Sequence, residues 1–349
     1  MQTEPTLQTI ADMTGLSRST VSRAMRNDPM QSRKTCERVQ KLAQEIGYRP
    51  SPMVSALMSQ LKRTRKTTTT GIIGLIDLFP EKNGWKKWRS LPPFIEGCKS
   101  RAEAYNYKLE HFWLGQPDLT PKRLYTILRS RGIIGLVVIP MFEMNAHMDM
   151  DITHFACATM GYSVKSPQMH RAARDYTKDI KIAIEKLSRL GYKRLGLVVP
   201  SQIEHLNEFH WSAGLLTYQQ SIPKTRRIPV LMTSFFHENK GLKQAKSEFK
   251  EWYLKNKPDV ILSYHDYVPK FLKQLGRSIP KDVGYVDLMH IKPDANFAGI
   301  HLDGQHVGGA TIDLVIDQIN RNEQGEPDFA KLTLVHGSWL DGDSVREQS

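Results

Sequence analysis

Residues 6–50 read TLQTIADMTGLSRSTVSRAMRNDPMQSRKTCERVQKLAQEIGYRP, and their spacing predicts three short helices joined by tight turns. The first predicted helix presents four residues on one face, Leu7, Ile10, Ala11 and Thr14. Gly15 can then adopt the left-handed conformation that ends a helix, and Ser17 can cap a second helix that runs to about residue 26. Because Gly15 follows Ala11 by four residues and Val21 follows Gly15 by six, the spacing is that of a helix-turn-helix.

A third helix is predicted after this pair. Ser32 can cap it, and Gly47 can end it. Its apolar stripe consists of Cys36, Val39, Leu42, Ala43 and Ile46. Ser51 and Pro52 can then start a short helix that includes Leu57. A helix of this length is unstable alone in water, so we expect it to fold only against a partner.

The basic residues of the chain are concentrated in this N-terminal segment. The 349 residues contain 49 Lys and Arg against 36 Asp and Glu, a net charge of +13. Residues 1–66 carry 12 of the basic and five of the acidic residues, a net of +7, and the remaining 283 residues carry +6. This balance indicates a polyanionic partner for the N-terminal segment, without separating DNA, RNA and a membrane surface. The net charge of +6 on the remaining 283 residues fits either further phosphate contacts or an ordinary solvated surface.

The predicted head resembles the DNA-binding head of the lactose and galactose repressor (LacI/GalR) family. The matching residues are Thr6-Leu7, Ile10-Ala11, Gly15-Leu16-Ser17, Thr20-Val21-Ser22-Arg23, Thr35, Val39 and Gly47-Tyr48-Arg49-Pro50. The resemblance implies that the second helix enters the major groove of double-stranded operator DNA. It also implies a homodimer, in which the hinge helices of two subunits pair and press against the DNA.

The resemblance assigns roles to seven residues of the head and hinge. By position, Arg18, Ser19 and Arg23 face base edges, and arginine is the side chain best suited to a bidentate bond with guanine. Ser17, Thr20 and Ser22 contact phosphates. Leu57 matches the hinge leucine that inserts into the minor groove. The hinge departs from the family pattern, because Ser51 replaces an asparagine and Val54-Ser55 replaces a common Ala-Arg pair.

From residue 71 onward, apolar strands alternate with helices, which predicts an α/β body. The predicted strands are 71–79, 107–113, 135–140, 155–160, 195–200, 227–232, 259–263 and 283–287. The predicted helices are 94–105, 120–131, 178–190, 211–220, 242–256 and 268–275. Near-continuous apolar strands between helices indicate parallel sheets covered on both faces. Roughly a dozen strands are too many for one compact sheet, so two doubly wound subdomains are expected.

The body also resembles the family's core, which has the periplasmic-binding-protein fold. The similarity is carried by RLGYKRLGLVVP (189–200), SYHDYVPKFLKQLGRSIPKDVGYVDL (263–288) and FAGIHLDGQHVGGATIDLVIDQI (297–319). It implies a head over 1–50, a hinge helix and linker over 51–70, and a body over 71–344. The N-subdomain is expected to combine 71–166 with 298–328, and the C-subdomain to combine 167–297 with 329–344, including LTLVHGSW.

A cleft between two such subdomains is the expected site of a small-molecule effector, because ligands bind beyond the carboxyl ends of parallel strands. The candidate residues are Phe79, Trp211, His265, Asp266 and Met289. By the resemblance, Trp211 replaces a sugar-clamping arginine, His265 an asparagine and Met289 an acidic residue. Trp85, Trp88 and Trp211 are aromatic surfaces suited to a sugar ring, although Trp85 and Trp88 are expected on an exposed loop. A less polar ligand, a partner protein or no effector remain alternatives.

The sequence contains no motif for an enzyme or a cofactor. GxGxxG after the first strand, GxxxxGK[ST], GxSxG and HExxH are all missing. The five-residue spacing of His205 and His210, and of His301 and His306, suits neither helix nor strand ligation of a metal. Three widely spaced cysteines support no disulfide framework. No signal peptide or membrane-spanning run is apparent, so we expect a cytoplasmic protein without membrane contact.

These observations predict a homodimeric, sequence-specific transcriptional regulator. We expect a repressor of a carbohydrate-utilisation operon, controlled by a sugar or sugar derivative and needing no cofactor or metal. The alternatives are a regulator that responds to no effector or to a protein partner, and a sugar-binding protein or enzyme with a similar body.

Overall fold

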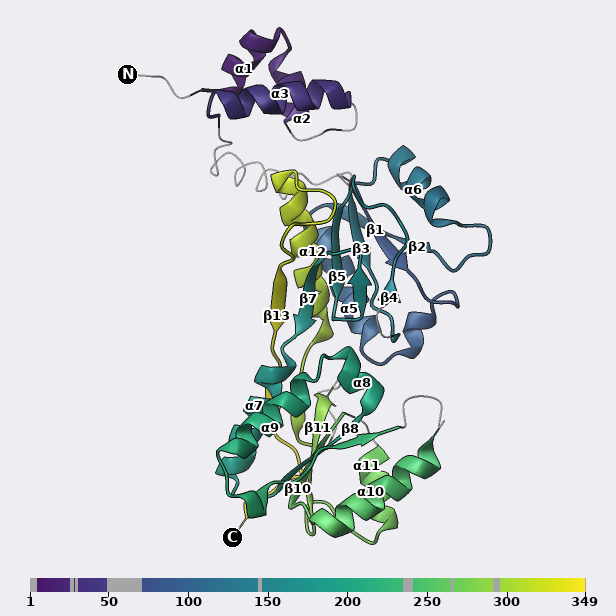
Figure 1. The fold of residues 1–349 in the computed structure, drawn as a ribbon, viewed down its shortest axis with the longest axis vertical. Coiled ribbons are helices and arrows are strands. Elements are labelled where there is room, and N and C mark those ends of the chain that lie inside the picture. The colour runs from purple at the N-terminus through teal and green to yellow at the C-terminus, as the bar shows by residue number, and fades with distance from the viewer. Residues whose placement is uncertain are drawn as a thin grey trace.

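The computed structural model describes residues 5–25, 28, 31–48, 71–143, 146–234, 241–264, 267–290 and 296–348. It has a helical head at one end and an α/β body of two subdomains (Figure 1). The predicted hinge and linker, residues 51–70, lie outside the described residues, as does Leu57. None of the helices in the described ranges is both long and apolar enough to span a bilayer.

The head consists of α1 (Leu7–Thr14), α2 (Arg18–Ala24) and α3 (Arg33–Glu45). The predicted turn and caps are confirmed, since Gly15 has φ 68° and the Ser17 and Ser32 hydroxyls each accept a backbone N–H of the following helix. The core shared by the three helices is Ile10, Ala11, Val21, Ala24, Cys36, Val39 and Ala43. The three helices therefore bury the face that the helical spacing predicted.

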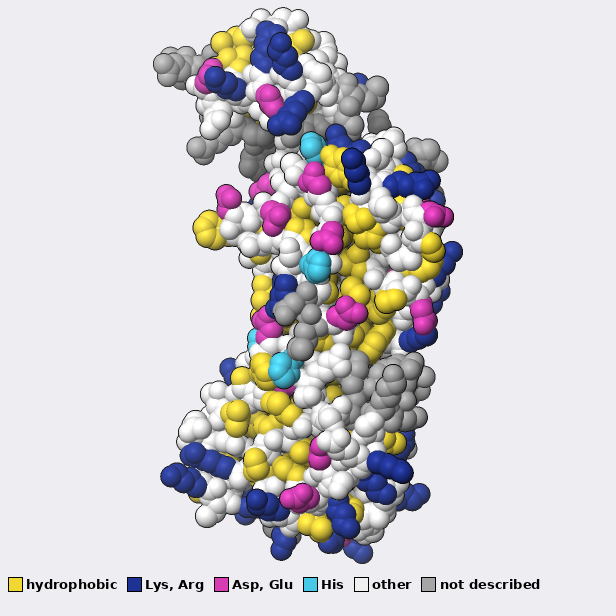
Figure 2. Space-filling view, turned by 45° about the vertical axis from the view of Figure 1, so that its right-hand side comes forward, with side chains coloured by type: hydrophobic (Ala, Val, Ile, Leu, Met, Phe, Trp, Pro, Cys, Tyr) yellow, Lys and Arg dark blue, Asp and Glu magenta, His cyan; other side chains and the backbone are white. Residues whose placement is uncertain are grey.

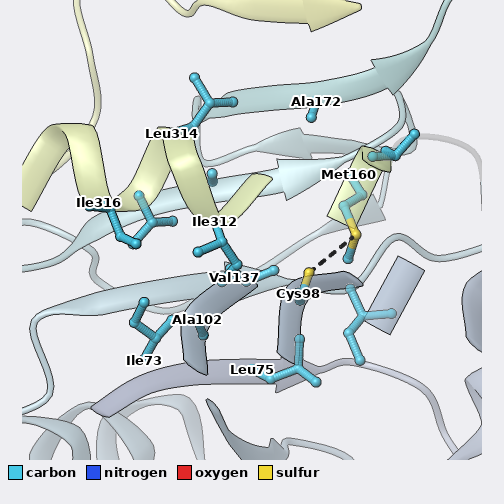
Figure 3. Close-up of a cluster of buried hydrophobic side chains, with 14 of the residues drawn as sticks. Ile73, Leu75, Cys98, Ala102, Val137, Met160, Ala172, Ile312, Leu314 and Ile316 are labelled. Atoms are coloured by element: carbon cyan, nitrogen blue, oxygen red, sulfur yellow. Dashed lines mark hydrogen bonds between the residues drawn. The ribbon is translucent and has the colours of Figure 1, made fainter. Parts of the chain in front are cut away.

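The N-subdomain contains a six-stranded parallel sheet in the order β13-β7-β5-β3-β1-β2. Its strands are β1 (Gly71–Asp77), β2 (Tyr107–Trp113), β3 (Gly135–Val138), β5 (Ala156–Met160), β7 (His170–Arg174) and β13 (Leu332–Val335). Helices α5 (Leu91–Ala104) and α12 (Gly304–Arg321) pack on one face with Ile73 and Leu75 (Figure 3), and α6 (Pro121–Ser130) packs on the other with Ile76. A 3-10 turn, η1 (Gly84–Lys87), precedes α5, and β4 (Ala146–His147) pairs with β6 (Val164–Ser166).

Glycines allow α5 and α12 to approach closely. A Cβ atom at Gly308 of α12 would lie 1.9 Å from the backbone oxygen of Phe94, and one at Gly97 of α5 would lie 2.1 Å from the backbone oxygen of Gln305. Both contacts are with backbone, which cannot turn away as a side chain can. Cys98 follows Gly97 in α5, and its sulfur lies 3.9 Å from the sulfur of Met160 in β5 (Figure 3).

The C-subdomain contains a second six-stranded sheet in the order β14-β12-β11-β10-β8-β9, in which only β14 is antiparallel to its neighbour. Its strands are β8 (Leu195–Pro200), β9 (Leu231–Thr233), β10 (Val260–Ser263), β11 (Gly284–His290), β12 (Gly299–His301) and β14 (Ser338–Leu340). Helices α7 (Tyr176–Arg189) and α9 (His210–Gln220) cover one face, and α10 (Leu242–Asn256) and α11 (Tyr267–Gln274) cover the other. The short α8 (Ser201–Leu206) follows β8, and η2 (Lys224–Arg226) precedes β9. The two sheets confirm the predicted pair of α/β subdomains.

The chain crosses between the subdomains later than the sequence indicated. The predicted crossings near 166, 297 and 329 are replaced by crossings after β7, after β12 and after β13. Strand β7, with the sequence HRAAR, belongs to the N-subdomain because it pairs with β5. Its two arginines hide the apolar pattern by which a buried strand is predicted. The segment LTLVHGSW, expected to lie wholly in the C-subdomain, is divided into β13 in one sheet and β14 in the other.

Candidate functional sites

The six residues of the predicted DNA-reading set that the structure describes lie on α2 or at its cap. Ser17, Arg18, Ser19 and Arg23 are exposed, whereas Thr20 and Ser22 are half-buried. Val21 and Ala24 point into the head's core. Because the inward and outward faces are separated in this way, α2 presents a polar and basic face to solvent.

The N-terminus of α2 is organised by the Ser17 hydroxyl. Its oxygen accepts the Thr20 N–H at 3.1 Å and lies 2.8 Å from both the Ser19 and Thr20 hydroxyl oxygens. Hydroxyl and N–H groups at a helix N-terminus favour an anion such as phosphate. Arg23, whose side chain is 50% exposed, has its nearest carboxylate at Asp28, 4.0 Å from Nε, and this exposed contact is weak.

Helix α3 fixes the orientation of the two helices before it. Arg38 donates from Nη2 to the backbone oxygen of Thr14 at 2.9 Å, and Gln40 donates from Nε2 to the oxygen of Ala24 at 3.1 Å. Both acceptors are carbonyls at helix C-termini, which have no partner within their own helix. Side chains of α3 therefore hold the ends of α1 and α2, and with them the outward face of α2.

The positive charge of the body lies mainly on the C-subdomain. Residues 175–301 and 336–349 carry 21 Lys and Arg against 16 Asp and Glu, a net of +5. Figure 2 shows Lys and Arg side chains on the head, on the part of the N-subdomain next to it and along one side, and on the C-subdomain at the end of the molecule away from the head. The distribution favours a solvated surface over additional phosphate contacts for the body's surplus.

Arg174, the last residue of β7, is buried where the chain first crosses between the subdomains. Its side chain is 2% exposed and forms an ion pair through Nε with Asp179 of α7, whose exposure is 0%. Its Nη2 donates to the backbone oxygen of Ile300 in β12 at 3.3 Å, and its Nη1 donates to the sulfur of Met289 in β11 at 3.0 Å. One side chain of the N-subdomain thus bonds to three elements of the C-subdomain.

Asp179 extends these contacts to the third crossing. Its second carboxylate oxygen accepts the N–H of Gly337 at 2.7 Å, in the segment between β13 and β14. Ile300 immediately precedes the second crossing. The Arg174–Asp179 pair therefore contacts the chain at or next to all three crossings.

A second ion pair joins the subdomains at Asp287 of β11. Arg89, which precedes α5, places Nη2 3.5 Å from Asp287 Oδ2. The other oxygen of Asp287 accepts the Met289 N–H at 2.8 Å. Burial raises the pKa of the Asp287 carboxyl, although this N–H and Arg89 act in the opposite direction.

Two more contacts bridge the subdomains. Gln202 of α8 donates to the backbone oxygen of Phe142 at 2.8 Å, and Lys165 of β6 pairs with Glu208, which precedes α9. Together with the Arg89–Asp287 pair they hold the subdomains close in this structure.

A pocket of about 200 Å³ lies at this junction. Ser90 and Phe94 line it from the N-subdomain, Met289 and His301 from the C-subdomain, and Arg174 and the crossing segment 302–304 complete it. The pocket is smaller than the roughly 300–1,000 Å³ of common ligand sites. It fits a small ligand or part of a larger one.

The predicted effector residues are divided between the pocket and the hydrophobic cores. Met289 lines the pocket. Phe79, 7% exposed, packs in the N-subdomain core, and its N–H donates to Asp77 Oδ1 at 2.9 Å. Trp211, 0% exposed, packs between Tyr176 and Tyr264, with ring centroids 4.9 and 5.8 Å away. Neither Phe79 nor Trp211 lines the pocket, and His265 and Asp266 lie outside the described residues.

Two aromatic residues of the N-subdomain stack on each other. Trp88 stacks on Phe142 with centroids 3.6 Å apart and ring planes 11° apart. Trp85 is buried in the N-subdomain core, so the expectation of an exposed loop at these tryptophans is wrong. In the described part of the chain, the buried polar side-chain atoms without a hydrogen-bond partner include Trp85 Nε1, Tyr162 Oη, Trp211 Nε1 and both ring nitrogens of His290.

Sequence reasoning missed Arg174, Asp179 and Arg89, and considered His301 only as a metal ligand. The available signal was an arginine and an aspartate five residues apart at the end of a short strand. Such a pair is ordinary on a surface, and only long-range packing makes this one buried.

Comparison with known proteins identifies the head. Residues 6–51 match the family model described as bacterial regulatory proteins, lacI family. A comparison of the whole sequence with curated proteins finds no match.

Solved structures similar to the chain include the lac repressor dimer bound to operator and the anti-inducer ONPF. It is 16% identical, with a TM-score of 0.54, covering 98% of this chain and 99% of that one. The transcriptional regulator CelR in complex with cellobiose is 17% identical, with a TM-score of 0.53 and coverage of 97% and 99%. A LacI family regulator from Enterococcus faecalis V583 with bound ribose is 15% identical, with a TM-score of 0.55 and coverage of 80% and 100%.

At these identities the solved structures establish the fold of the chain, while the family match covers its head. Residues 6–51 thus match the lacI family of bacterial regulatory proteins, and this helix-turn-helix head stands on a body with the periplasmic-binding-protein-like fold of the solved regulators.

Proposed function

We propose that this regulator binds a pseudopalindromic operator as a homodimer and represses genes of carbohydrate use in the cytoplasm. Each head would read one half-site, since protein and operator symmetry match in such complexes. The observation that carries this proposal is the capped helix α2 of the lacI-type head, which presents Arg18 and Arg23 to solvent. The protein would act by binding and not by catalysis.

In this proposal the residues of α2 divide between bases and backbone. Arg18, Ser19 and Arg23 face the base edges of the major groove, and arginine can donate two bonds to one guanine. Ser17, Thr20 and Ser22 contact phosphates, consistent with the hydroxyl cluster at the helix N-terminus. Leu57 of the hinge is proposed to insert into the minor groove.

We infer that a small carbohydrate controls the protein from the junction between the subdomains. Arg174 of one ion pair lines the pocket, and so do Ser90, which follows Arg89, and Met289, whose N–H donates to Asp287. A ligand there can therefore change contacts that depend on the angle between the subdomains. Similar regulators have been solved with cellobiose and ribose. Of the earlier candidates, Met289 is retained in the pocket, and Phe79, Trp211, His265 and Asp266 are proposed to contribute when the cleft opens.

A regulator that needs no effector, or that responds to a protein, is the second candidate. It is favoured by the small volume of the pocket and by the direct contacts that close the cleft, such as Gln202 with Phe142. Under this reading the body would be a dimerisation module with a fixed angle between its subdomains.

One experiment tests both candidates. An operator is selected from random DNA with the full-length dimer, and its affinity is measured by fluorescence anisotropy with and without a panel of sugars. Sequence-specific binding that a sugar changes by tenfold or more, about 1.4 kcal/mol, supports the first candidate. Specific binding that no sugar alters favours the second, and the lack of any preferred DNA sequence contradicts both.

A further inference from the structure

Strand β13 lies at one edge of the described sheet of the N-subdomain, and its outer side is free. On its inner side, the backbone oxygens of Lys331 and Val335 accept N–H groups of β7 and of the residue after it, both at 2.9 Å. Because backbone groups alternate in direction along a strand, those of Leu332 and Leu334 point away from β7. Within the described part of the chain they have no backbone partner.

The same edge exposes apolar side chains. Leu332 and Leu334 are each 46% exposed, and Phe329, three residues before the strand, is 88% exposed. Eight large apolar side chains are exposed in the described residues, and these three lie within positions 329–334. Lys331 is the one charged residue in that stretch, although the edge strands of soluble proteins are usually protected by several charges, by proline or by a covering element. The combination of free backbone groups and exposed leucines indicates a surface that another chain covers.

The outer side of β13 is complementary to a second copy of itself. In an antiparallel pair centred on Thr333, Leu332 of each copy lies opposite Leu334 of the other, and the outward backbone groups of these residues bond to each other. Directly opposite side chains lie on the same face of a sheet, so the leucines of both copies pack together. Thr333 then faces Thr333 of the second copy without a backbone bond, which agrees with its pairing to β7 on the inner side.

The charges at the two ends of β13 fit this antiparallel arrangement. Glu326 and Asp328, both exposed, precede the strand. Helix α7 lies at the other end, where the segment after β13 bonds to it, and its first two turns carry exposed Lys178 and Lys181. An antiparallel pair places the acidic end of one strand on the side of the basic end of the other, so opposite charges face each other at both ends.

The direction of β13 determines which molecules such a contact can join. The strand runs along the long axis of the molecule, and the head lies at one end of that axis (Figure 1). Because the two-fold axis of an antiparallel pair is perpendicular to its strands, the heads of the two molecules point in opposite directions. Two molecules paired in this way cannot read the two halves of one operator, so the contact is distinct from the proposed operator-binding homodimer.

We propose that the outer edge of β13 binds β13 of a second molecule, antiparallel and centred on Thr333, and thereby joins regulators that hold separate segments of DNA. A strand of four residues and three apolar side chains bury less than the roughly 800 Å² per partner of a standard interface. The contact is therefore weak and depends on protein concentration. It requires neither an effector nor the DNA-reading residues of α2.

Sedimentation velocity of the full-length protein without DNA tests the contact. The average mass of the wild type is expected to rise with concentration between roughly 1 and 100 μM, the range of weak specific contacts. Leu334→Lys places a charge opposite Leu332 of the second copy and should weaken this association at least about tenfold. Leu216→Lys, at a leucine of α9 that is also 46% exposed, is the matched control and should leave it unchanged. A constant mass, or an equal effect of the two substitutions, overturns the proposal.

Disulfide crosslinking tests the register of the pair. Thr333→Cys places two thiols opposite each other, with Cα atoms about 4.5 Å apart, and should form a covalent pair on mild oxidation. Leu334→Cys alone should crosslink poorly, but a mixture with Leu332→Cys should crosslink readily. The wild type gives the background, since its three cysteines are all buried.

Self-crosslinking of Leu334→Cys as efficient as that of Thr333→Cys would overturn the antiparallel pairing. An association that Leu334→Lys abolishes, together with crosslinks in the expected register, supports it. Neither experiment involves DNA, so a failure to find an operator would contradict the proposed function and would not affect this result.

Discussion

Arg174 and Asp179 form a buried ion pair whose two side chains contact the chain at or next to each of its three crossings between the subdomains. The arginine belongs to the sheet of the N-subdomain and the aspartate to the first helix of the C-subdomain. Any change in the angle between the subdomains must move these two elements relative to each other. In this position the ion pair would either resist a rotation of one subdomain against the other when an effector binds, or transmit that rotation between them.

Asp179→Asn should destabilise the body by about 3–5 kcal/mol, because it leaves the buried Arg174 guanidinium without its compensating charge. Urea unfolding followed by tryptophan fluorescence measures the loss. The double variant Arg174→Met with Asp179→Asn is the control and should recover a large part of the stability, since it removes the unpaired charge. Equal stability of the wild type and Asp179→Asn would show that the pair is not buried as described.

Asp287→Asn should change how stability depends on pH. Burial raises the pKa of the Asp287 carboxyl above the ordinary value of 3.8, so the folded state holds this proton more strongly than the unfolded state does. This carboxyl therefore favours folding most below pH 3.8, and its contribution is lost as the pH rises through the folded-state pKa. Stability differences between wild type and Asp287→Asn, measured by denaturant unfolding from pH 3.5 upward, should shift in favour of the variant as the pH rises above 3.8. A difference that is constant with pH, or that shifts the other way, would contradict the raised pKa.

Gly308→Ala should separate α5 from α12 and destabilise the N-subdomain by about 1–3 kcal/mol, because its Cβ would overlap the Phe94 backbone oxygen. Gly309 offers a matched control in the same helix. A Cβ there meets only the Arg101 side chain at 3.8 Å, so Gly309→Ala should be neutral or stabilise by about 0.5–1 kcal/mol. Thermal unfolding of both variants distinguishes them, and similar midpoints would argue against the close helix contact.

Arg18→Ala should weaken binding to the selected operator by about 1–3 kcal/mol and relax the preference at one base pair in each half-site. Ser17→Ala should instead weaken binding to all sequences by a similar factor, because its proposed partner is phosphate. Anisotropy with the operator and with single-base variants of it separates the two patterns. A uniform loss for Arg18→Ala would assign Arg18 to the backbone.

The helices of the head could be predicted from neighbouring residues, but the contacts between the two subdomains could not. Gly15, Ser17 and Ser32 each act on their own turn or helix end, so their types and spacing suffice to place the three helices. The burial of Arg174 depends on Ile300, more than 100 positions away along the chain. No pattern of neighbouring residues indicates a contact over that separation in the sequence.

The same reason explains the errors in the body. Apolar runs such as 195–200 marked most central strands correctly, because those strands are buried on both faces. β7 carries polar residues, and its place in the N-subdomain follows from pairing with β5, while β13 is placed there by pairing with β7. For the effector residues, strand order located the cleft, but which side chains line it depends on how closely the two subdomains approach.

The position of β13 also determines the order in which this protein can fold during synthesis. The helices of the head are contiguous within residues 7–45, so they can form as soon as that segment leaves the ribosome. The sheets of the body are incomplete until residues 332–340 are made, because β13 belongs to one sheet and β14 to the other. A nascent chain therefore has a complete helix-turn-helix head well before the body that is proposed to regulate this head is complete. Truncation before residue 332 would leave the sheets of both subdomains incomplete.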